Sequence, residues 1–133
     1  MSWLKFCDNP ESIYRIFDDN GLSNDCVSVQ EVCLHRDGPC LRIVFDLMSY
    51  PKRPPTKWNK FNTVQVSLNL IGVRDLEISG SGVNIVGDLV ARTTEGKLVE
   101  FEFTAIHGKL HLIGKADVLR IESISGYLNE TRS

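Results

Sequence analysis

This 133-residue chain lacks every catalytic signature that a sequence can readily show. It contains no G-x-S-x-G nucleophile elbow, no H-E-x-x-H zinc motif and no G-x-x-x-x-G-K-[ST] phosphate loop. The stretch Gly80-Ser81-Gly82 lies between two predicted strands, where it indicates a tight connection and not a nucleotide site. We therefore predict no catalytic residue and no cofactor, and we do not expect an enzyme.

Long apolar runs are also missing. Residues 1–8 contain no uninterrupted apolar stretch of the kind that a secretory signal requires. No window approaches the roughly 18 apolar residues of a membrane-spanning helix. We therefore expect a cytoplasmic protein that does not engage a membrane.

The cysteines and histidines have no diagnostic spacing. None of the four cysteines forms a C-x-x-C pair, so we expect reduced thiols that pack as small hydrophobes: Cys7, Cys26, Cys33 and Cys40. Cys33 and Cys40 flank a predicted turn, which leaves a disulfide open there, although a reducing compartment disfavours it. His107 and His111 straddle Gly108 in a β region, so they lack the helical geometry of a metal pair, and we predict no metal site.

Net charge is small but unevenly divided. The total is −2, with a pI of about 5.9, which is not the basic profile of a general nucleic-acid-binding protein. Residues 48–61 contain four basic residues and no acid, so this segment carries +4 and the rest of the chain sums to −6. Residues 8–46 hold eight acids against three arginines, a balance of −5. Opposite charges are therefore separated along the chain.

Residues 9–20 are predicted to form a short helix. Asn9 is a favourable N-cap and Pro10 suits the first helical position. Ile13, Ile16 and Phe17 follow i, i+3, i+4 spacing and would form one apolar face. Gly21 would end the helix.

From about residue 26 the hydrophobic period changes to two. Apolar and polar residues alternate over 41–47, 64–70 and 99–105, and glycine-containing turn signals separate these runs. With 42% hydrophobic and 24% charged residues, the composition is that of a globular protein, and the length suits one domain over residues 1–133. We predict a mainly β fold: an antiparallel β-sandwich or open barrel of about seven to nine strands with one short N-terminal helix.

The segment over residues 48–61 interrupts this pattern. It holds three of the five prolines, which do not suit a central strand, together with Lys52, Arg53, Lys57 and Lys60. The favoured interpretation is a stiff connection whose Trp58 folds onto the edge of the sheet. A docking loop is the main alternative, because Tyr50, Arg53 and Trp58 are of the types that anchor protein interfaces. Nucleic-acid binding is disfavoured, because four charges in a net acidic chain form a weak footprint.

Two groups of acids are candidate contacts for a basic partner. Glu100 and Glu102 project from the same face of one predicted strand, opposite Val99, Phe101 and Phe103. A solvated charged face is the favoured interpretation for this pair. The second group lies in the acidic first third of the chain: Asp18, Asp19, Asp25 and Glu31.

The centre of the chain resembles the immunity protein 50 family. The resemblance rests on the order of several short pieces: Phe45-Asp46-Leu47, Tyr50-Pro51, Pro54-Pro55, Lys57-Trp58, 62–66, 70–73 and the closing 121–127. Trp3, Asn9-Pro10 and Phe17 extend it toward the N-terminus. The resemblance implies a cytosolic antitoxin of a bacterial polymorphic toxin system, which binds and neutralises a cognate toxin domain. The family has no established catalytic residues to transfer.

The leading hypothesis is therefore a binding protein that inhibits a toxin domain by occlusion. An acidic face would speed the encounter with a basic toxin. A small β-sandwich domain that binds or processes a small ligand is one alternative. A homo-oligomeric structural module is another, although nothing in the sequence indicates self-association.

Overall fold

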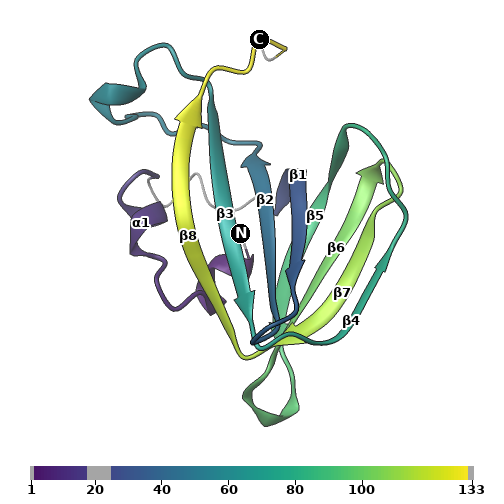
Figure 1. The fold of residues 1–133 in the computed structure, drawn as a ribbon. Coiled ribbons are helices and arrows are strands. Elements are labelled where there is room, and N and C mark those ends of the chain that lie inside the picture. The colour runs from purple at the N-terminus through teal and green to yellow at the C-terminus, as the bar shows by residue number, and fades with distance from the viewer. Residues whose placement is uncertain (1, 18–24, 132–133) are drawn as a thin grey trace.

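The computed structural model describes residues 2–17 and 25–131, which form one strongly bent antiparallel sheet (Figure 1). Its strands are β1 (Cys26–His35), β2 (Cys40–Leu47), β3 (Thr63–Ile71), β4 (Arg74–Ser79), β5 (Ile85–Thr93), β6 (Val99–His107), β7 (His111–Ala116) and β8 (Val118–Tyr127). The spatial order is β4-β7-β6-β5-β1-β2-β3-β8, so β4 and β8 end the sheet. The predicted mainly β, antiparallel fold is confirmed, with eight strands in a sheet that does not close.

The sheet divides into two wings that diverge in Figure 1. One wing is β8-β3-β2-β1 and the other is β5-β6-β7-β4. Within the sheet, they are joined by the pairing of Cys26–Val29 with Ile85–Asp88. A bulge between Val29 and Glu31 interrupts β1 just where its pairing with β5 ends. Because bulges bend a strand and increase its twist, this one accounts for the separation of the wings.

The hydrophobic core lies between the inward faces of both wings. The predicted alternation is confirmed in β2, where Leu41, Ile43, Phe45 and Leu47 are buried, and in β3 over residues 64–70. Phe101 and Phe103 of β6 belong to the same core. The rings of Trp3 and Phe45 pack edge to face with centroids 5.4 Å apart, so the N-terminal segment closes one side of this core.

The N-terminal segment differs from the predicted helix. A 3-10 helix, η1, covers Ser2–Phe6, and the α-helix α1 covers only Glu11–Tyr14. The prediction that Asn9 caps the helix was wrong, because its side chain makes no capping bond and instead bonds the backbone of Ile121 in β8. The predicted stop at Gly21 lies outside the described residues. No helix among the described residues has the length and hydrophobicity needed to cross a membrane.

This segment covers part of the outer edge of β8. Cys7 forms a parallel bridge with Leu119, and the Asp8 N–H donates to the Leu119 carbonyl over 2.9 Å. Asn9 then continues the pairing, since its Nδ2 donates to the Ile121 carbonyl and its Oδ1 accepts from the Ile121 N–H, both over 2.8 Å. Beyond Asn9 the chain turns away into α1 and leaves a cleft beside β8.

Candidate functional site

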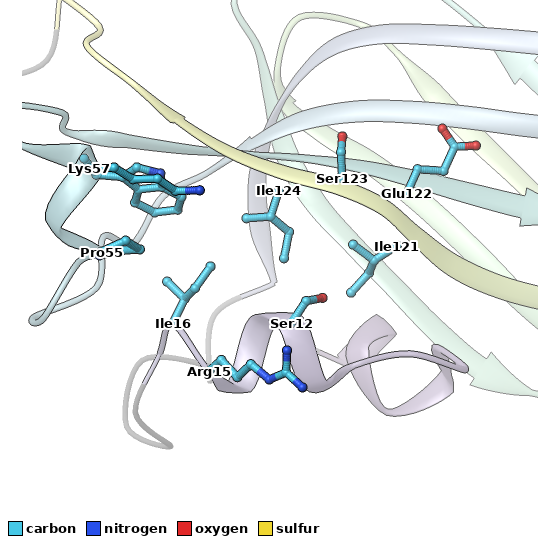
Figure 2. A pocket seen from close by; sticks show the side chains of 10 residues that line it. Ser12, Arg15, Ile16, Pro55, Lys57, Ile121, Glu122, Ser123 and Ile124 are labelled. Carbon is cyan, nitrogen blue, oxygen red and sulfur yellow. The ribbon is translucent and has the colours of Figure 1, made fainter.

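A cleft of about 400 Å³ lies between the N-terminal helix, the proline-rich segment and β8 (Figure 2). Three parts of the chain that are distant in sequence supply its walls. They are Ser12, Arg15 and Ile16 around α1; Pro55, Lys57 and Trp58 in or beside the 3-10 helix η3 (Thr56–Trp58); and Ile121, Glu122, Ser123 and Ile124 of β8. Isoleucine side chains and the indole make much of this surface apolar.

Trp58 forms the wall between this cleft and a second hollow. The residue is only 6% exposed, and its backbone N–H donates to the Pro55 carbonyl over 2.9 Å. The indole lies against Gly126 of β8, so the prediction that Trp58 folds onto the edge of the sheet is confirmed. On its other side, Tyr50 and Phe61 help to line a hollow of about 380 Å³. The proline-rich segment is therefore a packed element whose two surfaces are both concave.

Two buried hydroxyl groups near these hollows have no hydrogen-bond partner within the described residues. One is the Oγ of Ser12, in the wall of the cleft. The other is the hydroxyl of Tyr50, whose ring lies 6.5 Å from that of Trp58 between centroids. Burial raises the pKa of Tyr50, so the hydroxyl stays protonated and can donate. Unsatisfied buried hydroxyls are costly, and a bound polar group would relieve that cost.

Unpaired positive charge gathers around the same segment. Its four cations are exposed, and none forms an ion pair within residues 2–17 and 25–131: Lys52, Arg53, Lys57 and Lys60. Arg15, exposed on the opposite wall of the cleft, is likewise without an ion pair there (Figure 2). Glu122 is the one acid among the described residues that line the cleft. The rim therefore favours an anionic group.

Three of the six acidic candidates, Glu31, Glu100 and Glu102, form ion pairs with neighbouring side chains. Glu100 accepts from Arg92 over 2.6 Å, and Glu102 bonds both Arg92 and His111 over 2.8 Å. These hydrogen bonds, chiefly the one from His111, lower the pKa of Glu102. Glu31 pairs with Arg42 over 2.7 Å. A basic partner would have to compete with these internal cations.

The structure also places the acidic candidates apart. Glu31 is on β1, whereas Glu100 and Glu102 are on β6 in the other wing. Asp25 immediately precedes β1, and Asp18 and Asp19 lie outside the described residues. Partner binding by these residues stays a prediction. Of the predicted contacts, the structure brings Tyr50 and Trp58 together, with Arg53 exposed in the same segment.

Asp46 is a buried polar residue that the sequence analysis did not single out. It is 1% exposed, and its carboxylate accepts hydrogen bonds from Gln30, Gln65 and the Tyr127 hydroxyl. These bonds join β1, β2, β3 and β8. The local signal for this residue was an acid within the otherwise apolar run 43–47. Its three donors are neutral, and they tie β2 to strands on both of its sides.

The described residues contain no group of three or more histidine, cysteine or acidic side chains that could hold a metal ion. All four cysteines are free. Cys33 lies opposite Arg42, and Cys40 opposite His35, so the two predicted turn cysteines are not directly paired across the hairpin. The arrangement offers surfaces for binding. A thiol–imidazole contact, between Cys33 Sγ and His35 Nε2 over 3.7 Å, lies on β1 and outside the cleft.

The fold and the cleft define an open antiparallel β-sheet protein with a basic-rimmed surface hollow. The family model described as Immunity protein 50 matches residues 9–127. The chain therefore belongs to that family, which confirms the resemblance seen in the sequence. No curated protein and no solved structure gave a match.

Proposed function

We propose that this protein is a cytosolic immunity protein that binds a cognate toxin domain and neutralises it by occlusion, acting as one domain over residues 1–133. The observation that supports this most directly is membership of the Immunity protein 50 family over residues 9–127. The toxin domain would be the variable C-terminal part of a polymorphic toxin. Neutralisation by occlusion requires affinity and shape and needs no catalytic group.

The geometry is consistent with a binding role. Trp58 and the segment around it are held against β8, so little conformational entropy would be lost when a partner docks. The unpaired cations of residues 48–61 would steer an acidic surface toward the cleft and then contact it. Aromatic anchors bordered by charge are common at the centres of protein interfaces.

The direct test is rescue of cells that express the toxin. The probe is the C-terminal domain of the protein encoded immediately upstream of this gene, where the proposal expects the toxin, expressed from an inducible promoter in a bacterial host. Co-expression of this protein should restore growth, and the two chains should co-elute as one complex. An unrelated toxin domain of similar charge is the control and should still kill the cells. Death of the cells despite abundant folded protein would refute the proposal.

A small-molecule site is the second candidate, because the volume of the cleft lies within the range of ligand pockets. Its apolar wall and unpartnered Ser12 hydroxyl suit a compact ligand with one polar group. The rescue experiment separates the two functions, since a ligand-binding domain would leave the toxin active. Light scattering of the isolated protein tests the remaining alternative, a homo-oligomeric module.

A further inference from the structure

The outer edge of β8 is only partly paired. Cys7, Asp8 and the Asn9 side chain cover it as far as Ile121. Ser123–Ser125 pair with β3 on the inner side, and Glu122 is the extra residue of a bulge opposite Ser67 and Leu68. The described residues place no backbone partner on the outer side of Glu122–Ser125. In an antiparallel ladder every second residue directs its N–H and C=O away from its neighbour. This stretch therefore presents unused backbone groups.

The cleft lies directly beside this free stretch. Ile121 and Ile124 face the helix in Figure 2, and Ile16 and Trp58 close the apolar space around them. The buried, unpartnered Oγ of Ser12 lies in the same wall. If a partner strand paired with the edge of β8, one of its side chains could enter this apolar cavity and hydrogen bond to the Ser12 hydroxyl.

The charge around the cleft indicates the charge of the segment that would carry that side chain. Arg15 and Lys57 stand on opposite walls, both exposed and without ion pairs in the described part of the chain. Among the residues that the structure describes, Glu122 on β8 is the only acid that lines the space. Both cations favour an acidic segment in or beside the cleft, whereas a segment rich in lysine would be repelled.

We propose that the toxin domain adds an extended, acidic segment to the edge of β8, with an apolar side chain in the cleft and acidic side chains near Arg15 and Lys57. This inference rests on the proposed function and names the surface that performs it. Main-chain hydrogen bonds to Glu122–Ser125 would provide affinity, as in other cases of strand addition, and the cleft would select the side chain. The segment would continue the edge pairing that Cys7–Asn9 begins.

The first test is charge reversal with a matched control. Affinity is measured by calorimetry between this protein and a catalytically inactive form of the toxin domain that the rescue experiment identifies. The double variant Arg15→Glu/Lys57→Glu should bind about tenfold or more weakly, with a reduced dependence on salt. Lys97→Glu/Lys109→Glu changes net charge equally, at exposed cations outside the cleft, and should bind like the parent protein.

The second test reports strand addition itself. In hydrogen exchange of the complex, amides within Glu122–Ser125 should become protected, whereas the other terminal strand, β4, should not change. Ile16→Ser should weaken binding, and Ile106→Ser, at an exposed residue of β6, should not. Circular dichroism and melting curves verify that each variant is folded before its affinity is compared.

The outcomes distinguish this inference from the function on which it rests. If the parent protein rescues cells and forms the complex, but charge reversal changes affinity less than about twofold and Glu122–Ser125 stays unprotected, the strand-addition site is wrong and the immunity function stands. If the parent protein neither rescues cells nor binds the toxin domain, both proposals fail. If the charge-reversal variant loses affinity and Glu122–Ser125 become protected in the parent complex, the results support both the immunity function and the strand-addition site.

Discussion

The indole of Trp58 lies directly on the backbone of Gly126. A Cβ placed on Gly126 would be 2.7 Å from Cδ2 and 2.9 Å from Cε2 of the ring, and 3.0 Å from the ring of Phe61. These separations are shorter than a methyl group tolerates. The absence of a side chain in β8 therefore determines where the basic segment sits and shapes one wall of the cleft.

Gly126→Ala should push the Trp58 ring out of its place. We expect a red shift in tryptophan fluorescence and a loss of about 1–3 kcal/mol in the free energy of unfolding, as for other overpacked sites. Trp3, the other tryptophan, is buried on a different side of the core and provides the constant part of the signal. Ser125→Ala, at an exposed neighbour, is the control. An unchanged spectrum and melting temperature would show that the contact is dispensable.

Asn9 should be required to hold the N-terminal segment on β8. Asn9→Ala removes two 2.8 Å hydrogen bonds and leaves the N–H and C=O of Ile121 without these partners, at a cost of about 1–3 kcal/mol. Asn9→Asp can still accept from the N–H but cannot donate, so it should fall between alanine and the parent in denaturant titrations. In Asn9→Ala, the Ile121 amide should also exchange its hydrogen faster than in the parent protein. Asn59→Ala, in the exposed segment, should be neutral, and an equal effect of both alanine variants would contradict the assignment.

Stability should depend on pH through Glu102. The hydrogen bond from His111, and then that from Arg92, lowers the pKa of this carboxyl below its ordinary value of 4.5. A carboxyl with a lowered pKa in the folded state stabilises the protein above its unfolded-state pKa, and this stabilisation is lost as pH falls through the folded-state value. Urea titrations from about pH 6 to about pH 3 should therefore show a shallower decline for Glu102→Gln than for the parent.

The control for this pH series is Glu77→Gln. Glu77 is exposed on β4 and forms no ion pair within the described residues. Its variant should follow the parent curve. If Glu102→Gln also follows the parent curve, the ion pairs across β5, β6 and β7 do not contribute to acid sensitivity.

The four cysteines should differ in reactivity. Burial, reinforced by the charge of Asp8, raises the pKa of Cys7 to about 12, so almost none of it is thiolate near neutrality. Burial, and then Asp88, also raises the pKa of Cys26. Iodoacetamide should therefore modify half-buried Cys33 and Cys40 first, Cys26 more slowly and Cys7 only after unfolding, as followed by peptide mass mapping. Equal rates for Cys7 and Cys40 in the native protein would contradict this order.

Local patterns in the sequence determined the elements of the fold. The alternation over residues 64–70 specified both a strand and its buried face, because neighbouring side chains of a strand point to opposite sides. The spacing of Ile13, Ile16 and Phe17 specified a helical turn with one face turned inward. The local sequence could not show that the Asn9 side chain would bond Ile121 instead of capping the helix. Ile121 lies in a strand near the other end of the chain.

The tertiary structure decided which charged side chains form ion pairs within the protein and which remain free to contact a partner. The sequence alone determined that residues 48–61 carry +4, that Glu100 and Glu102 share a face and that the central pieces follow the family order. It did not determine that Arg92 would neutralise that face, or that Arg15 would stand across a cleft from Lys57. Ion pairs and clefts depend on distances between remote residues, and those distances follow from strand order and register. Hydrophobic spacing along one strand contains no information about which strand becomes its neighbour.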